Sequence, residues 1–183
     1  MPNHIQNRLM LFEDNGLAED ILASLIGDEV EFDFSKIIEK PKELIDRNSS
    51  HENDSEILVE LYGADNGCDW STMEWGTKWN AYDVISIDKK GVSFKTAWSS
   101  PIPVIAELSK QNPKVLFLLE YADEDIGYNC GVKHFLNGEV IVSKDMSIGN
   151  LKNKEESIRW ALIMRYGSDE NYEEDYENNK WDI

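Results

Sequence analysis

Hydrophobic and polar positions alternate at the start of the chain and then repeat with helical spacing. Residues 4–12 (HIQNRLMLF) alternate in the manner of a half-buried strand. Residues 17–26 repeat apolar side chains every three or four positions. This stretch lies between Asn15, a residue type that favours helix starts, and Gly27, one that favours helix ends. The chain is therefore predicted to begin with a strand followed by an amphipathic helix.

The next part of the chain has a weaker pattern. Residues 31–38 (EFDFSKII) alternate aromatic and acidic side chains, which fits either a short strand or a loop tucked against the core. Residues 46–56 (DRNSSHENDSE) hold nothing to bury and predict a mobile loop. Two short helices, the second near 69–75, are expected to form an insert near residues 55–76. The apolar residues that share one face of the first helix are Ile57, Leu58, Leu61 and Tyr62.

From Tyr82 onward the apolar positions mostly follow a period of two. Residues 82–87 and 92–96 flank the turn sequence DKKG and predict a β-hairpin. Ser100-Pro101 then opens an amphipathic helix that ends at Asn112-Pro113. The near-continuous apolar run VLFLLEY, residues 115–121, is typical of a central strand.

The last part of the chain predicts a further hairpin and helix. Strand candidates at 129–136 and 140–143 are joined by Asn137-Gly138, a strong hairpin signal. A helix then runs from Asn153, a predicted N-cap, to Tyr166.

Without the insert, the predicted order is strand, helix, two-stranded hairpin, helix and strand. This is the β-α-β-β-α-β plan of ferredoxin-like folds, an α+β class in which helices cover one face of an antiparallel sheet. A chain of 183 residues with 41% hydrophobic content supports one such core. We expect a single ferredoxin-like domain over residues 1–167, with the helical insert and an added C-terminal hairpin and helix.

The charge changes the picture of possible partners. Asp and Glu number 36 against 18 Lys and Arg, so the net charge is −18. Because nucleic-acid affinity comes largely from basic residues, direct DNA or RNA binding is disfavoured. The acids either keep the protein soluble or form a surface for a basic protein partner, as a mimic of nucleic acid would.

The location of the protein is predicted from what the sequence lacks. No apolar run has membrane-spanning length, and the start of the chain has no secretory signal pattern. Cys68 and Cys130 have no CxxC spacing and are expected to be reduced thiols. We expect a cytoplasmic protein of a bacterial host, without membrane association.

Residues 168–183 form an acidic segment that also carries aromatic side chains, which a purely solvated tail does not need. This tail is either disordered or docked on the body or on a partner. The candidate partner-binding residues are Asp169, Glu170, Tyr172, Glu173, Glu174, Asp175, Tyr176, Glu177 and Trp181.

Four of the six tryptophans lie between Trp70 and Trp98. One interpretation is a small-ligand pocket, in which Trp75 and Trp79 form an aromatic wall with Lys78 and Asp83 as polar anchors. The other interpretation, which we favour, is structural: Trp79 and Trp98 pack between sheet and helices. The possible pocket residues are Trp75, Lys78, Trp79, Tyr82, Asp83 and Trp98.

The same region supports a family resemblance. The segments WGTKWNA (75–81) and TAWSSPIP (96–103) resemble the YubB-type ferredoxin-like domain, a family of largely uncharacterised proteins carried by phages, plasmids and other mobile elements. The opening PNHIQNRL and the segment Phe32 to Leu44 also resemble that family, so the likeness covers roughly residues 2 to 130. The resemblance implies a fold and a setting in mobile DNA, but it does not indicate an activity.

The remaining residue types suggest no catalytic site. His4, His51 and His134 have no metal-ligand spacing, and the glycines occur singly, without a phosphate-binding loop. With 36 acids, neighbouring carboxylates arise by chance, so we assign no acid–base pair. We expect no cofactor and no metal.

These observations predict a non-catalytic acidic binding protein of mobile-element origin. Its expected role is to inhibit a nucleic-acid-handling defence protein of the host, in the manner of anti-CRISPR or anti-restriction proteins, by presenting a negative surface to a basic groove. The alternatives are a small-ligand-binding protein or enzyme that uses the aromatic pocket, and a structural or assembly subunit. The partner and the oligomeric state stay open.

Overall fold

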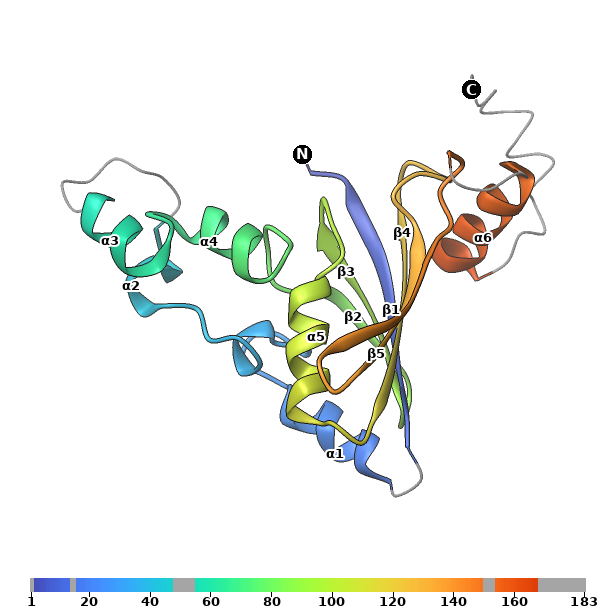
Figure 1. Cartoon of the computed structure of the whole chain (residues 1–183), viewed down its shortest axis with the longest axis horizontal. Coiled ribbons are helices and arrows are strands. Elements are labelled where there is room, and N and C mark those ends of the chain that lie inside the picture. The colour runs from blue at the N-terminus through green and yellow to red at the C-terminus, as the bar shows by residue number, and fades with distance from the viewer. Residues whose placement is uncertain (1, 14–15, 48–54, 150–153, 168–183) are drawn as a thin grey trace.

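A computed structural model describes residues 2–13, 16–47, 55–149 and 154–167, which build one antiparallel sheet with helices on both sides (Figure 1). The strands are β1 (His4–Phe12), β2 (Tyr82–Asp88), β3 (Gly91–Ala97), β4 (Leu116–Asp123), β5 (Gly131–Leu136) and β6 (Glu139–Asp145). The helices are α1 (Leu17–Ser24), the 3-10 turn η1 (Phe34–Lys36), α2 (Lys42–Ile45), α3 (Ser55–Tyr62), α4 (Gly67–Glu74), α5 (Ile102–Gln111) and α6 (Lys154–Tyr166).

The sheet confirms the predicted ferredoxin-like class. Its strand order is β2-β3-β1-β4-β5-β6, so β1 lies between β3 and β4 and is antiparallel to both. Leu9 of β1 is opposite Val92 on one side and Leu119 on the other. The added hairpin of β5 and β6 extends the sheet beyond β4.

Each face of the sheet has its own hydrophobic cluster. Successive strand residues point to opposite faces, and Leu119 and Ala122 of β4 accordingly belong to different clusters. The larger cluster holds Leu9 and Leu119 together with residues of α1 and α5. The smaller one joins Ala122 to Ile158 and other residues of α6. The two helices of the ferredoxin-like plan thus share one face, and the added helix α6 lies against the other (Figure 1).

Helices α2, α3 and α4 form an arm that extends away from the sheet (Figure 1). The arm joins the larger cluster through Leu44, Leu58 and Trp70. Of the apolar face predicted for α3, Leu58 is buried, whereas Ile57 and Leu61 are largely exposed. The arm projects beyond the sheet, which places this side of α3 away from the sheet's hydrophobic layers (Figure 1).

Local signals account for most of the boundaries. Residues 31–38 form the tucked loop rather than a strand, with Phe32 and Phe34 wholly buried. Asn66 caps α4, because its Oδ1 accepts the backbone N–H of Cys68 and Asp69 at 3.1 and 2.9 Å. The predicted caps Asn15 and Asn153, residues 48–54 of the predicted loop and the tail 168–183 lie outside the described residues.

None of the helices in the described part of the chain is long and apolar enough to cross a membrane.

Candidate functional site

The tryptophan-rich segment divides into a buried half and an exposed half. Trp70 and Trp75 are buried, and their rings meet edge-on with centroids 5.6 Å apart. The indole Nε1 of Trp75 donates a hydrogen bond to the carbonyl oxygen of Ile38 at 3.0 Å, and its ring also meets Phe34. These two tryptophans therefore anchor the arm to the core.

Asn7 is a fully buried polar residue at the centre of a hydrogen-bond network. Its Nδ2 donates to Oγ1 of Thr96 at 2.9 Å, and its Oδ1 accepts the hydroxyl of Ser100 at 2.7 Å. The hydroxyl of Thr96 in turn donates to the carbonyl of Ser99 at 2.8 Å. Because the partners satisfy one another, the network fixes β1, β3 and the following turn in one arrangement. We call Asn7, Thr77, Thr96, Ser99 and Ser100 the Asn7 network.

The rest of the resemblance motif joins the same network. The buried Thr77 donates from its hydroxyl to the carbonyl of Ala97 at 2.8 Å and accepts the Ala97 N–H at 3.2 Å. The hydroxyl of Ser99 donates to the carbonyl of Gly76, which has a φ of +74°. The motif residues other than Lys78, Trp79 and Trp98 are thus mainly structural.

Trp98 is half exposed, at 53%, and its backbone is in the left-handed region with a φ of +70°. Two asparagines hold this conformation: the N–H of Trp98 donates to the carbonyl of Asn3 at 2.9 Å, and Nδ2 of Asn129 donates to the carbonyl of Trp98 at 3.2 Å. The favoured prediction that Trp79 and Trp98 pack inside was wrong, because Trp79 is also 41% exposed. A left-handed residue in the turn after β3 directs the indole outward.

Lys78 and Trp79 complete the aromatic part of this surface. The ammonium of Lys78 lies 4.9 Å from the ring centroid of Trp98 and 5.9 Å from that of Trp79. Trp79 also meets Tyr82 edge-on at 6.2 Å. The predicted polar anchors do not pair with each other, because Asp83 forms its ion pair with Lys95 at 2.9 Å.

The end of β4 carries three consecutive acidic residues, one strand away from Trp98, because β1 lies between β3 and β4. Asp123 is buried and accepts hydrogen bonds from Nδ2 of Asn3 and of Asn129, at 3.1 and 3.0 Å. Asp125 is exposed and accepts from the same Asn3 side chain at 3.0 Å. These residues were not among the predicted site residues, although the sequence shows an acidic run at the end of a central strand. We call Lys78, Trp79, Tyr82, Asp83, Trp98, Glu124 and Asp125 the Trp98 surface.

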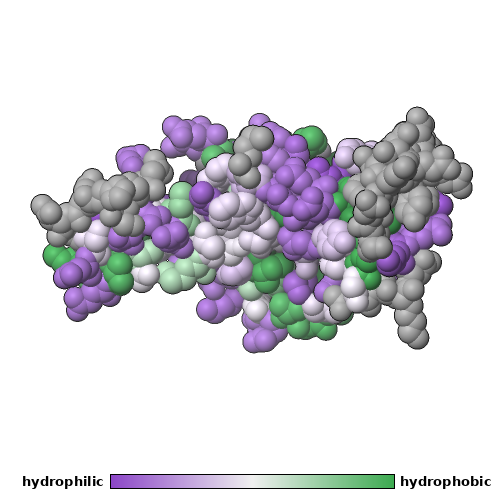
Figure 2. Space-filling model, turned by 90° about the horizontal axis from the view of Figure 1, so that it is seen from above, coloured by the Kyte–Doolittle hydropathy of each residue, from purple (hydrophilic) through white to green (hydrophobic). Residues whose placement is uncertain are grey.

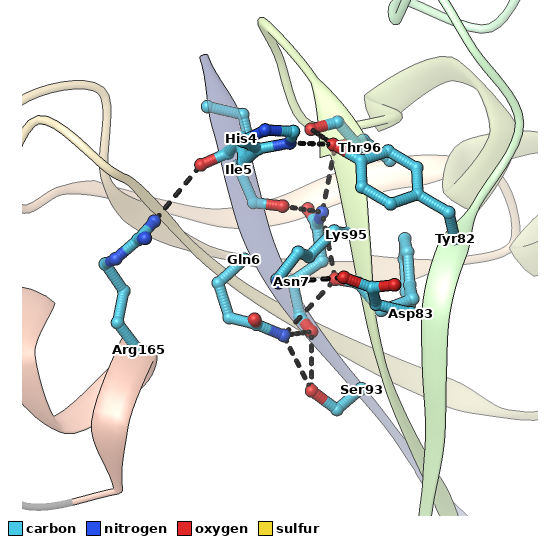
Figure 3. Close-up of polar contacts among 11 residues, drawn as sticks. His4, Ile5, Gln6, Asn7, Tyr82, Asp83, Ser93, Lys95, Thr96 and Arg165 are labelled. Atoms are coloured by element: carbon cyan, nitrogen blue, oxygen red, sulfur yellow. Dashed lines mark hydrogen bonds and ion pairs between the residues drawn. The ribbon is translucent and has the colours of Figure 1, made fainter.

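Tyr82 supports the surface from a half-buried position (Figure 3). Its hydroxyl lies 2.5 Å from Nδ1 of His4 and 3.1 Å from the carbonyl of Thr96. A carbonyl oxygen can only accept, so the Tyr82 hydroxyl donates its proton to Thr96. The contact with His4 must then be donated by the histidine, whose Nδ1 carries a proton. Burial, helped by the negative charges of Asp83 and Glu124, raises the pKa of Tyr82 to about 12. Tyr82 therefore acts as a neutral hydrogen-bonding group near pH 7.

A separate hollow of about 450 Å³ lies at the base of the arm. Trp75, Lys78 and Trp79 line it together with Asp28 and Lys40. Tyr82, Asp83 and Trp98 are not among its lining residues. The structure thus divides the six predicted pocket residues between this hollow and the Trp98 surface, with Lys78 and Trp79 belonging to both.

The upper end of the molecule in Figure 1 is largely polar. Seen from above, hydrophilic side chains cover much of its central part, and hydrophobic ones show in smaller patches (Figure 2). Within the residues that the structure describes, no group of three or more His, Cys, Asp or Glu side chains could hold a metal ion. What the Trp98 surface offers is aromatic faces beside carboxylates, a combination suited to binding cationic side chains.

Comparison with known proteins bears on the fold. Residues 74–161, just under half of the chain, match the family model described as the ferredoxin-like domain in Api92-like protein. The crystal structure of a protein api92 from Yersinia pseudotuberculosis aligns with a TM-score of 0.47 and 11% identity, over 79% of this chain and 98% of that chain. No curated protein matches the sequence. The family match agrees with the ferredoxin-like sheet described above.

Proposed function

We propose that this protein is a non-catalytic binding protein that engages a basic surface of another protein through the Trp98 surface. The single observation that carries the proposal is the half-exposed indole of Trp98, held in a left-handed backbone conformation by Asn3 and Asn129. Such a conformation costs free energy for a residue other than glycine, and costs of this kind concentrate at functional sites. Exposed tryptophans are also frequent binding hot spots.

The chemistry of the surface favours a cationic partner. Lys78 already places an ammonium group over the Trp98 ring, which shows that the ring face accepts a cation. Glu124 and Asp125 add negative charge one strand away, in a chain whose net charge is −18. A lysine or arginine of a partner would be attracted by the carboxylates and could stack on the indoles.

The specific form of the proposal is inhibition of a nucleic-acid-handling defence protein of a bacterial host, with the acidic surface placed in its basic groove. The support is the net negative charge together with the resemblance to YubB-type proteins of phages and plasmids. On the same grounds, we propose that the chain belongs to the YubB-type family and acts in the cytoplasm. The acidic aromatic tail, residues 168–183, would add to the contact.

The test is a titration of the protein against purified CRISPR-effector and restriction nucleases at increasing salt. Exposed charge pairs are screened, so the affinity should fall between low and physiological ionic strength. Trp98→Ala should weaken binding by about 2 kcal/mol, roughly 30-fold. The matched control is Phe12→Ala, a similarly exposed aromatic residue at the opposite end of β1. An affinity that does not depend on salt, or equal losses in the two variants, would contradict the proposal.

A second candidate, small-ligand binding, is favoured by the hollow at the base of the arm. Its lining combines Trp75 and Trp79 with charged side chains of both signs, including Asp28 and Lys40. Its volume of about 450 Å³ lies within the usual range for ligand sites. A thermal-shift screen with nucleotides and amino acids tests it, because a ligand that binds the folded state raises the unfolding temperature. A screen in which no compound shifts that temperature would count against this candidate.

A further inference from the structure

Helix α1 packs against β3 and leaves the neighbouring edge strand β2 partly uncovered. It has eight residues, so its length is about 12 Å. Its buried residues, Ala18 and Ile21, face the larger cluster, and the helix contacts β3. The edge strand β2 is consequently left with a partly uncovered inner face.

A groove of about 590 Å³ occupies the space between α1 and β2. From β2 its lining takes every second residue, Val84, Ser86 and Asp88, so the groove follows the strand. Its volume is typical of binding sites, and most of its lining is apolar. The apolar side chains that line it are Leu22, Ala23, Ile26, Phe32, Val84 and Val92.

Strand β2 is also free to pair on its outer side. It is the first strand in the sheet order, and β3 is its only strand neighbour in the described part of the chain. Ile85 and Ser86 pair regularly with Ser93 and Val92, between two register shifts. An edge of this kind presents a row of backbone N–H and C=O groups that can hydrogen-bond to an added strand.

The rim of the groove is acidic. Lys89 is paired with Glu19 at 2.9 Å. Glu31 and Asp88 line the same groove and have no ion-pair partner among the described residues. The rim charge therefore favours a basic occupant over an acidic one.

We propose that β2 and this groove bind an extended segment of a partner protein, which adds to the sheet as a strand. An apolar side chain of that segment fills the space between α1 and β2, and a flanking lysine or arginine lies near Glu31 or Asp88. This site uses the later part of β2, from Val84 to Asp88, whereas the Trp98 surface takes only Tyr82 and Asp83 from the start of that strand. Helix α1, which forms the other wall, lies at the other end of the sheet from the start of β1 (Figure 1). The site does not depend on the function proposed above.

The test uses a random peptide library displayed on phage. Phage are first depleted on the Ala23→Trp variant, whose new indole fills the groove, and the remainder are selected on the wild-type protein. Ala23 is exposed, so the substitution leaves the core intact. The matched control is Ser24→Trp, because Ser24 is the next residue of α1 and is not among the lining residues. Circular dichroism checks that both variants are folded.

Selected peptides should carry an apolar residue with a neighbouring lysine or arginine. Measured by fluorescence anisotropy, their affinity should fall at least about tenfold in Ala23→Trp. It should be unchanged in Ser24→Trp and in Trp98→Ala. N-methylation of every second backbone amide should abolish binding when the methylated amides face β2. Methylation of the other set should not, because those amides face away from β2.

Three results would overturn the proposal. The first is that no phage survive the depletion, and the second is that methylation of either set of amides leaves binding intact. The third is that light scattering shows a wild-type dimer that Ala23→Trp disrupts. The last result would assign the β2 edge to a second copy of this chain.

Discussion

Trp75 and Trp98 belong to one sequence motif but have opposite environments. Trp75 is 2% exposed and donates a hydrogen bond to Ile38, whereas Trp98 is 53% exposed and lies beside Lys78. The difference comes from the backbone: Trp75 ends a helix in the right-handed region, and Trp98 follows a strand in the left-handed region. One sequence motif therefore supplies both a buried scaffold and the surface that this scaffold presents.

The largest expected effect is on stability at the buried position. Trp75→Ala should lower the free energy of unfolding by about 3–5 kcal/mol, because a large core side chain is removed and a cavity remains. Trp98→Ala should change it by about 1 kcal/mol or less, since the side chain is mostly solvated. Urea unfolding followed by circular dichroism measures both. Equal losses would mean that the two tryptophans are not divided into scaffold and surface.

The second expected effect concerns the scaffold beneath the surface. Asn7→Leu leaves the hydroxyls of Thr96 and Ser100 without their buried partner and should cost about 1–3 kcal/mol. The triple variant Asn7→Leu, Thr96→Val and Ser100→Ala removes all three polar groups, and we expect it to recover part of that loss. The same unfolding measurement applies. A triple variant less stable than Asn7→Leu would contradict this expectation. It would show that the hydroxyls of Thr96 and Ser100 stabilise the fold even without Asn7.

The third effect isolates the backbone of Trp98. Glycine tolerates a positive φ, whereas alanine retains the strain. Trp98→Gly should therefore be more stable than Trp98→Ala by about 1 kcal/mol, while both lose the indole and bind partners equally weakly. Thermal unfolding of the two variants tests this. If glycine gives no advantage, the left-handed conformation is not a source of strain.

The smallest effect is a pH dependence at Tyr82. Burial raises the pKa of this residue to about 12 in the folded protein, against about 10 in an unfolded chain. The folded state therefore holds the phenol proton more tightly. The stabilisation from this group is complete below about pH 10 and is lost as the pH rises toward 12. Tyr82→Phe cannot titrate, so its stability should fall less steeply over that range. Parallel slopes for wild type and variant would contradict the assignment.

Much of the fold could be predicted from the sequence, because it depends on periodic burial. The alternation in residues 4–12, the Asn137-Gly138 turn and the apolar run of β4 all fix elements through local physics. The same alternation even points Asn7 inward, between Ile5 and Leu9, which was an available sign of a buried polar group.

The candidate site was less predictable, for a physical reason. The direction of Trp98 depends on a left-handed turn residue that is held by Asn3 and Asn129, which lie far away in sequence. No periodicity encodes such a contact. The exposure of Ile57 and Leu61 could not be predicted for a related reason, since helical spacing identifies a face but not whether another layer covers it.

The bond between Asn3 and Trp98 has a practical consequence for biochemistry. Any polypeptide joined ahead of Pro2 is attached within a few residues of this hydrogen bond to the Trp98 backbone. An affinity tag at that position would lie near the surface whose binding is to be measured. Any weakening of binding that the tag causes could then be mistaken for a loss of function. The turn between β5 and β6, where Asn137 is exposed, offers an insertion point for a label away from that indole.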